Sequence, residues 1–302
     1  MRHRRAGIGL AFVAACISGV SVFLNSFALR EFGDPILYTT AKNLVAAAIV
    51  LAAGVSLSAA RSSVGLTLPR TRREQVGLIA VGVVGGGIAF ALFFQGLAQT
   101  SSTSAAFVQK TLVIWVAVLA VAFLRERFSL VHLAAIALLV GGQAAASGGL
   151  GPFLFDGGEL MVLAATLLWA VEVVIAKPLL RGLSPLTVAS ARLGIGVAVL
   201  VALALASGAG GQLAAVTLQA WLWVAVTGVI LSAYVVTWYF ALSKAGAIDV
   251  TAVLVFGAVI TAVLGTGIRG ANLAPAAFGL ALITFGCVLI ATLASDRRQR
   301  LV

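Results

Sequence analysis

The sequence predicts an all-α integral membrane protein of ten transmembrane helices. These form two similar five-helix halves of opposite orientation, with both termini in the cytoplasm. Three observations predict this fold: an apolar composition, ten apolar runs long enough to span a membrane, and a repeated segment. Of the 302 residues, 62% are hydrophobic and only 10% are charged, whereas a soluble domain carries about 25% charged residues. Lipid accepts apolar side chains on every face of a helix, so the bilayer explains this composition.

The apolar runs define the expected helices, because about 17–25 apolar residues cross a bilayer as a helix. In chain order the predicted spans are 7–29, 36–57, 76–98, 104–124, 130–146, 160–180, 186–206, 218–242, 250–268 and 273–294. The first run is too long for a signal-peptide core, so we expect it to be retained as a helix. Gly, Pro, Ser and charged residues separate the runs, as turns require.

Lysine and arginine in the connecting segments predict the orientation, because cytoplasmic loops carry an excess of them. Fifteen lie on one predicted side: Arg2, Arg4, Arg5, Arg61, Arg70, Arg72, Arg73, Arg125, Arg127, Lys177, Arg181, Lys244, Arg297, Arg298 and Arg300. Only Arg30 and Arg269 lie on the other side. The strict alternation supports the span assignment, and both termini are therefore expected in the cytoplasm.

An internal repeat relates the two halves of the chain. The segment PILYTTAKNLVAAAIVLAAG from Pro35 resembles PLTVASARLGIGVAVLVALA from Pro185, and Lys42 corresponds to Arg192, also 150 positions later. Residues 125–142 similarly align with 269–286. Because five spans per half is an odd number, the second half must enter the membrane from the opposite face. We therefore predict an inverted repeat, with residues 1–148 and 149–302 as its two units.

Composition and motifs exclude several classes of function. The net charge of +11 does not indicate nucleic-acid binding, because the basic residues lie in short segments between apolar runs. Cys16 and Cys287 lie within apolar runs and lack metal-type spacing, so they are expected to be buried hydrophobes. His3 and His132 form no HExxH-type pair, and no nucleotide-binding motif is present. An enzyme is therefore not expected, nor is a metal or other cofactor.

Four charged residues fall at membrane depth: Lys42, Lys110, Glu172 and Arg192. Each costs at least about 2.5–3.5 kcal/mol there, so each needs a physical reason. Glu172 and Arg192 lie at comparable depth on successive helices. They form either an ion pair that holds the two helices together or a functional pair. In the second case Arg192 binds a substrate carboxylate, or Glu172 takes up a proton during the cycle.

Lys42 and Lys110 have no acid at matching depth. Each lies about 10 Å inside the outer end of its helix, so its ammonium group either snorkels to the interface or binds an anionic substrate. Gln109 stands beside Lys110, and Trp169 and Tyr234 are aromatic candidates for lining the same cavity. Packing and interfacial anchoring are the alternatives for those two rings. Residues 85–87 are three glycines, expected to allow close packing or bending.

The chain is similar to the drug/metabolite transporter superfamily, of the type with two EamA domains. The resemblance rests on Asp34, Pro35 and Lys42 at the second helix and on Ser184, Pro185 and Arg192 in its second copy. It also rests on TSAAFVQKTLVIWVAVLAVAFLRERFS, which ends like the family's "LGE" turn with Glu126 as its acid. Two departures are present: the family's helix-4 proline is absent near 109–113, and the second turn is GTGIRG at 265–270, without an acid.

The resemblance implies a secondary-active transporter in the cell membrane. With the charged residues above, we expect an exporter of a small polar metabolite, of amino-acid or organic-acid type, that works by alternating access at a central cavity. The expected substrate-binding residues are Lys42, Gln109, Lys110, Trp169, Arg192 and Tyr234, with Glu172 as the proton-coupling residue. The alternatives are a proton-coupled exporter of drugs or cations and a flippase for a phosphate-bearing lipid. The expected partners are the small-molecule substrate and the lipid bilayer, with coupling either to a proton through Glu172 or by exchange, and the chain is expected as a monomer or a homodimer.

Overall fold

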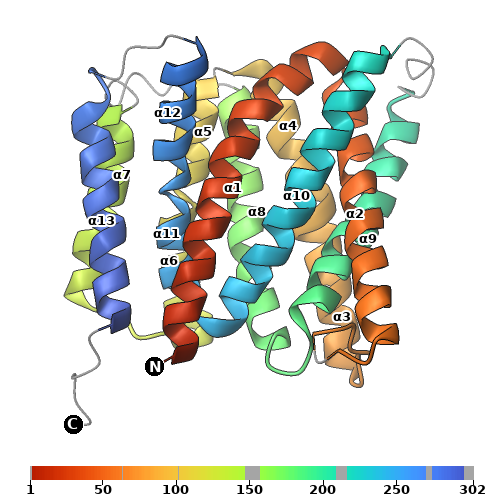
Figure 1. The fold of residues 1–302 in the computed structure, drawn as a ribbon, viewed down its shortest axis with the longest axis horizontal. Helices are drawn as coiled ribbons and strands as arrows, with labels where there is room; N and C mark the ends of the chain where they lie inside the picture. Colours follow the sequence, from red (N-terminus) through yellow and green to blue (C-terminus); the bar gives the residue numbers. More distant parts are fainter. Residues whose placement is uncertain are drawn as a thin grey trace.

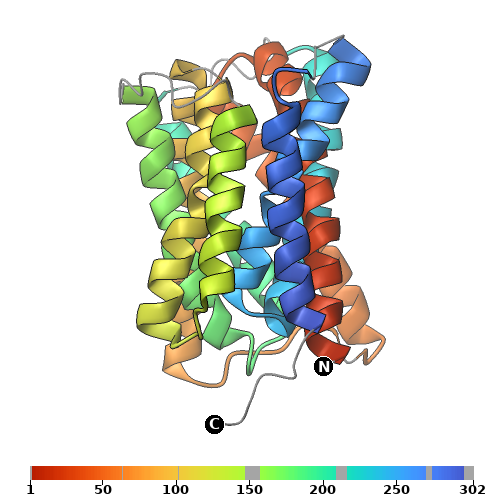
Figure 2. The same ribbon diagram turned by 90° about the vertical axis from the view of Figure 1, so that its left-hand side faces the viewer.

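The computed structural model describes residues 2–62, 64–100, 102–146, 157–208, 216–269 and 274–295. In this part of the chain the regular structure is helical throughout (Figures 1 and 2). The first half contains α1 (Arg2–Phe32), α2 (Pro35–Ala59), α3 (Arg72–Ala80), η1 (Val81–Ile88), α4 (Ala89–Gln99), α5 (Ser102–Lys110), α6 (Leu112–Leu119), η2 (Ala120–Leu124) and α7 (Leu130–Ala146). The segments α3–η1–α4 and α5–α6–η2 each form one span, so this half has five spans.

The second half also has five spans. They are α8 (Gly157–Leu179), α9 (Pro185–Ala206), α10 (Leu218–Lys244), α11 (Ala247–Leu254) with α12 (Gly257–Arg269), and α13 (Ala277–Ser295). Eight of the ten spans are long and apolar enough to cross a membrane by themselves, and α7 and α13 are shorter apolar helices. The prediction of a ten-helix membrane protein is therefore confirmed.

The second half enters from the end opposite to the first. Gly158, at the start of α8, packs against Gly96 at the end of the third span, and Leu179, at the end of α8, packs against Gly77 in α3. Helix α8 is thus antiparallel to a span that begins, like α1, at the N-terminal end of the bundle (Figure 1). Helix α13 returns to that same end (Figure 2). We call it the basic end, because it carries the arginine-rich connections and is the predicted cytoplasmic side.

The two copies of the repeated segment begin with the same helix N-cap arrangement. The side chain of Asp34 accepts a hydrogen bond from the backbone N–H of Leu37, 2.8 Å away, and Pro35 opens α2. The side chain of Ser184 accepts a 3.1 Å hydrogen bond from Thr187 N–H, and Pro185 opens α9. An N-cap acceptor followed by proline fits the exposed donors of a helix start. The matched starts set Lys42 and Arg192 at equal distances along their helices.

Glycines in η1 allow α9 to approach the third span closely. A Cβ atom at Gly86 would lie 1.9 Å from the carbonyl oxygen of Arg192, and one at Gly87 would lie 2.7 Å from Val199 Cβ. Only glycine permits this backbone separation. The wider π-helical turn of η1 occurs at the same position. The predicted close packing of 85–87 is therefore confirmed, and its consequence is that α9 carries Arg192 into the centre of the bundle.

The fourth and ninth spans are both interrupted near their middles. At the α5–α6 junction, Thr111 N–H bonds to Val108 O at 3.1 Å, and the Thr111 hydroxyl bonds to the same oxygen at 2.6 Å. At the α11–α12 junction, Val255 N–H bonds to Ala252 O at 3.2 Å. These are i→i−3 bonds, which tighten the helix locally. Thr111 and Val255 lie 144 positions apart, as do residues 125 and 269 of the aligned segments, so the interruptions are counterparts in the repeat.

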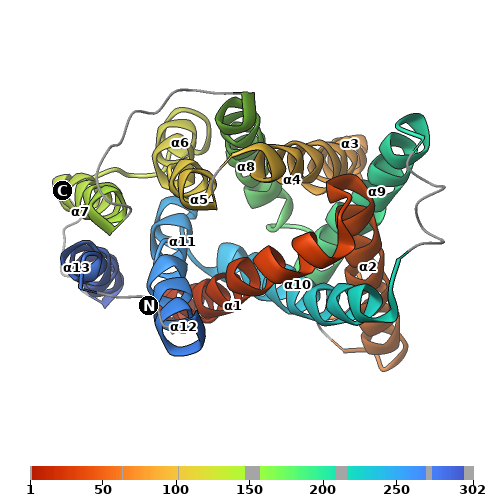
Figure 3. The same cartoon turned by 90° about the horizontal axis from the view of Figure 1, so that it is seen from above.

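The outermost pair of helices, α7 and α13, packs mainly on itself. A Cβ atom at Gly142 of α7 would lie 2.7 Å from the carbonyl oxygen of Gly279 of α13. Seen from above, this pair stands at one side of the bundle, and the remaining helices form a ring (Figure 3). The cavity described below lies inside that ring and not beneath the α7–α13 pair.

Candidate functional site

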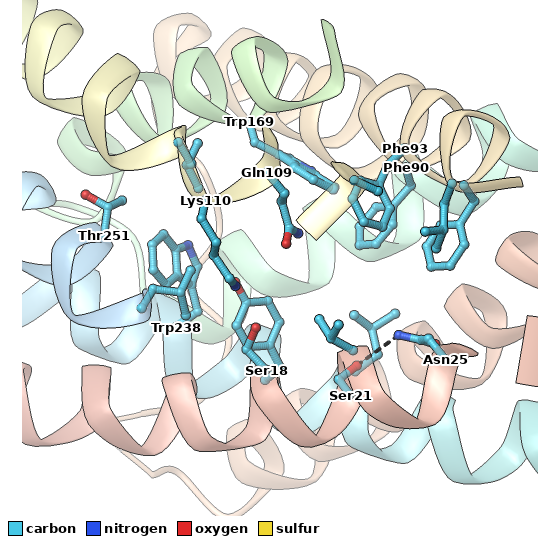
Figure 4. Close-up of a pocket in the computed structure, with 18 of the residues that line it drawn as sticks. Ser18, Ser21, Asn25, Phe90, Phe93, Gln109, Lys110, Trp169, Trp238 and Thr251 are labelled. Carbon is cyan, nitrogen blue, oxygen red and sulfur yellow. Dashed lines mark hydrogen bonds between the residues drawn. The ribbon is translucent and has the colours of Figure 1, made fainter. Parts of the chain in front are cut away.

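A cavity that is partly open to solvent lies at the centre of the bundle, with about 130 Å³ of space for the centres of water-sized molecules. Its walls come from both halves of the chain: α1, α2, α4, α5, α6, α8, α9, α10 and α11. Lys110 and Leu112, on the two sides of the first helix interruption, line it, as do Leu254 and Val255 at the second. Figure 4 shows part of the lining, with the polar side chains of α1 opposite an aromatic wall.

All seven residues that the sequence predicts for the site line this one cavity: Lys42, Gln109, Lys110, Trp169, Glu172, Arg192 and Tyr234. They come from α2, α5, α8, α9 and α10. The structure thus gathers residues that are up to 192 positions apart. Their roles in binding and coupling stay predictions.

Lys42 points into the protein and does not reach the membrane surface. Its side chain is 2% exposed, and Nζ lies 3.8 Å from the ring centroid of Phe94 and 5.0 Å from that of Tyr38. Nζ donates a 3.3 Å hydrogen bond to Asn25 Oδ1 on α1. Among the described residues no acid forms an ion pair with it. The snorkelling alternative for Lys42 is therefore excluded, because aromatic rings and Asn25 enclose the ammonium group.

Glu172 and Arg192 form a buried ion pair, with Arg192 Nε 3.4 Å from Glu172 Oε2. They are 2% and 5% exposed. The hydroxyl of Tyr239 donates a hydrogen bond to the other carboxylate oxygen of Glu172. The pairing predicted as one alternative is thus present. It does not satisfy the guanidinium, because Nη1 of Arg192 has no hydrogen-bond partner in the described part of the chain.

Gly85 makes the space that Glu172 occupies. A Cβ atom at this position would lie 2.3 Å from Glu172 Cγ, so any larger residue would displace the carboxylate. The carbonyl oxygen of Gly85 also accepts a 3.1 Å hydrogen bond from Trp169 Nε1. The glycines of η1 therefore place both α8 residues, in addition to bringing α9 close.

Lys110 and Gln109 end α5 just before the interruption at Thr111. Both are partly buried, and neither forms a hydrogen bond or ion pair with the described residues. Figure 4 shows both side chains extending into the cavity, with Lys110 directed across it toward α1. The break in the helix occurs without the proline of the related family, and the Thr111 hydroxyl donates a hydrogen bond to Val108 O at the tightened turn.

A polar stripe on α1, not predicted from the sequence, also lines the cavity. Ser18, Ser21 and Asn25 follow one another at intervals of three and four residues, which places them on one face of the helix. Asn25 Nδ2 donates a 3.2 Å hydrogen bond to Ser21 Oγ. This spacing in an otherwise apolar helix was a signal that could have been used. Trp238 of α10 and Tyr239, which binds Glu172, were missed as well.

A second group of polar side chains, which we call the basic-end network, lies between the cavity and the basic end. Arg4 of α1 donates two hydrogen bonds, of 3.1 and 2.8 Å, to Asp249 Oδ2 on α11. His132 of α7 lies with Nε2 3.2 Å from Asp249 Oδ1. The backbone N–H of Ser129 donates to His132 Nδ1 at 3.2 Å, so Nε2 carries the hydrogen that Asp249 accepts.

Glu126 and Lys177 complete the basic-end network by binding backbone groups. Glu126 accepts hydrogen bonds from the N–H groups of Ala247 (2.7 Å) and Ile248 (3.2 Å), and so caps the start of α11. Lys177 Nζ donates to the carbonyl oxygens of Leu242 and Ala245 at the end of α10, both at 2.5 Å. The acid of the family-like turn is therefore the cap of a helix in the other half. Within the described residues, no cluster of His, Cys, Asp or Glu could hold a metal ion.

Comparisons with known proteins agree with this architecture. The EamA-like transporter family matches the chain twice, at residues 5–147 and 156–292. No curated protein matches it significantly. A solved crystal structure, described only as that of a protein, is similar with a TM-score of 0.70 and 19% sequence identity, over 95% of this chain and 99% of the other. That likeness concerns the fold alone. The two family matches span nearly the whole chain, which is thus a multi-pass membrane protein and belongs to the EamA-like transporter family.

Proposed function

We propose that the chain is a secondary-active transporter that exports a small polar metabolite, of amino-acid or organic-acid type, by alternating access at the central cavity. One observation carries the substrate class: the described residues of the lining include three basic side chains, Lys42, Lys110 and Arg192, and a single acid, Glu172. With Glu172 paired to Arg192, the two lysines remain without a carboxylate. In apolar surroundings an uncompensated cation strongly favours an anionic ligand.

Lys110 is the residue that meets the anionic group of the substrate in this proposal. It lies at a helix interruption, has no partner among the described residues, and extends into the cavity (Figure 4). Gln109, Trp169 and Tyr234 contact the rest of the substrate from the same walls. Lys42 is held by Asn25 and the rings around it, so it contributes positive potential from a fixed position.

The repeat and its interrupted helices support alternating access. The units 1–148 and 149–302 rock against one another around the cavity, as inverted repeats do in other transporters. The interruptions at Thr111 and Val255 are the points where the fourth and ninth spans bend during this motion, because the i→i−4 bonds are already broken there. They lie at the cavity wall, so bending changes access to the site.

Glu172 couples transport to protons in this proposal. When Glu172 takes up a proton, Arg192 loses its counter-charge and its guanidinium becomes available to the substrate anion. Tyr239 continues to hold the carboxyl group. Exchange of one substrate for another is the other mode of coupling. Uptake measured with and without an imposed pH gradient separates the two, since exchange at equal substrate concentrations does not need the gradient.

The test is a solute panel in proteoliposomes, with labelled organic acids, amino acids and lipophilic cations. We expect anions to be transported, and we expect Lys110→Gln to abolish their transport while the protein stays folded. Lys244→Gln is the matched control, because Lys244 ends α10 and does not line the cavity. Normal anion transport by Lys110→Gln would remove Lys110 from the mechanism. Transport of cations alone, or scrambling of labelled phospholipid without solute uptake, would replace the proposed function.

A further inference from the structure

We propose that the cavity selects an amphipathic organic anion: a carboxylate attached to a flat apolar body, preferably aromatic, and lacking a charged amine. This inference rests on the proposed function only in using the same cavity as the binding site. It narrows the substrate class, because the lining divides into a set of unpaired hydrogen-bond donors, a polar stripe and an aromatic wall.

Among the described residues, the charged and indole groups of the cavity that lack partners are donors, whereas the amide of Gln109, also without a partner, can both donate and accept. Lys110 Nζ and Trp238 Nε1 line the cavity and form no hydrogen bond with the described residues, and Arg192 Nη1 is buried without a partner. An ammonium, an indole N–H and a guanidinium can donate hydrogen bonds but cannot accept them. The group that satisfies such a set is an acceptor with several lone pairs, and an ionised carboxylate supplies about four acceptor sites.

A positively charged amine on the substrate finds no unpaired carboxylate among the described lining residues. Glu172 is the one carboxylate in the described part of the lining, and its two oxygens are engaged by Tyr239 and Arg192. An ammonium group would have to displace one of them, and it would also face the charges of Lys42 and Lys110. A simple carboxylate therefore fits the cavity better than a zwitterion of the same size.

The apolar body of the substrate fits the aromatic wall. Phe90 and Phe93 of α4 surround Trp169 of α8, with ring centroids 5.5 and 5.3 Å from that of Trp169. These three rings face the polar stripe of α1 across the cavity (Figure 4). Aromatic surfaces of this kind bind flat apolar groups by offset or edge-to-face contacts. The wall and the donors lie in one cavity, so one ligand can use both.

Binding to purified protein in detergent tests this without any transport step. The probes are phenylacetate, which has the ring and the carboxylate, acetate, which lacks the ring, phenylacetamide, which lacks the charge, and phenylalanine, which adds an ammonium. Calorimetric titration should rank phenylacetate first, with each of the others weaker by about tenfold or more. Equal or tighter binding of phenylalanine, or equal binding of phenylacetamide, would overturn the proposal.

Two variants test separately what the hydrogen-bond donors and the aromatic wall contribute to binding. Lys110→Gln should weaken phenylacetate and acetate alike, by about tenfold to a hundredfold, because it removes a charged donor. Phe93→Ala should weaken phenylacetate by about tenfold and leave acetate unchanged. Phe278→Ala is the control for the wall, since this ring is 70% exposed on α13, outside the cavity. Phe93→Leu keeps most of the volume if the alanine variant fails to fold. If the Phe93 variants bound phenylacetate and acetate more weakly by the same factor, the aromatic subsite would be contradicted.

Transport of the same probes separates this inference from the proposed function. Selective binding of phenylacetate without its uptake into proteoliposomes would support the inferred binding site. It would contradict the proposal that the protein transports this compound. Uptake of acetate and phenylalanine as fast as phenylacetate, at equal concentrations, would leave a transporter and overturn the selectivity inferred here. Saturable uptake of phenylacetate that is lost in Lys110→Gln supports both.

Discussion

Arg4 and Asp249 are joined by two hydrogen bonds although 245 positions separate them in the chain. Asp249 is 4% exposed, and it lies two residues before Thr251, which lines the cavity. Through Asp249 the start of α1 and the start of α7 are both tied to α11. The carboxylate therefore stands between the cavity and the basic end, where it holds three helices of both halves together.

Asp249→Asn should loosen this end of the protein. The amide keeps the size of the carboxylate but loses the charge that Arg4 binds, so we expect the free energy of unfolding to fall by about 1–3 kcal/mol. We also expect a cysteine placed at Thr251, in a background without Cys16 and Cys287, to react faster with a membrane-impermeant thiol reagent applied from the basic end. Glu31→Gln is the control, since Glu31 is exposed. Unchanged labelling would show that Asp249 does not restrict access.

Gly86→Ala should destabilise the protein, because a Cβ atom there would lie 1.9 Å from the Arg192 carbonyl oxygen. Separating α9 from η1 by enough to relieve this contact costs about 1–3 kcal/mol. Gly194→Ala, in the same region of α9, is the matched substitution, as a Cβ atom there meets no other atom within 4 Å. It should be neutral or stabilise the helix by about 0.5–1 kcal/mol. Thermal unfolding of both variants in detergent checks the pair, and equal melting temperatures would contradict the tight packing.

The Glu172–Arg192 pair should behave as a coupled unit. Glu172→Gln leaves the buried Arg192 charge without its partner, and we expect a loss of about 3–5 kcal/mol of stability. Adding Arg192→Gln removes that unpaired charge, so the double variant should be more stable than Glu172→Gln alone. Denaturant unfolding of the four proteins in the cycle measures the coupling. Strictly additive effects would mean that the 3.4 Å contact contributes nothing to stability.

Lys42→Met should leave the stability of the protein unchanged but weaken its transport of an anionic substrate. Methionine fills nearly the same space among Phe94, Phe90 and Tyr38 and needs no hydrogen bond, so folding should be unaffected or slightly improved. The loss of a fixed positive charge at the cavity should nevertheless reduce the apparent affinity for an anionic substrate. Melting temperature and the substrate dependence of uptake measure the two effects. A stable variant with unchanged anion affinity would assign Lys42 a packing role alone.

The boundaries of the spans could be predicted closely, but the interruptions within them could not. The fourth predicted span, 104–124, contains the break at Thr111, and the ninth, 250–268, contains the one at Val255–Phe256. Neither break has a proline or glycine at its centre. The Thr111 hydroxyl makes a local bond that a regular helix also allows, so the choice between the two conformations depends on the neighbouring helices.

The sequence alone determined the membrane class, the ten spans and the repeat. In lipid every backbone polar group must be satisfied within its own helix, so a sufficiently long apolar run is enough to specify a span. The tertiary structure alone decided which charges meet. The sequence predicted Lys42 and Lys110 at similar depths, yet Lys42 is enclosed by rings and bound to Asn25, while Lys110 extends into the cavity without a partner among the described residues. The rotation of a helix about its own axis is set by how it packs against neighbouring helices. The local sequence therefore does not determine which side chain of another helix a given residue will face.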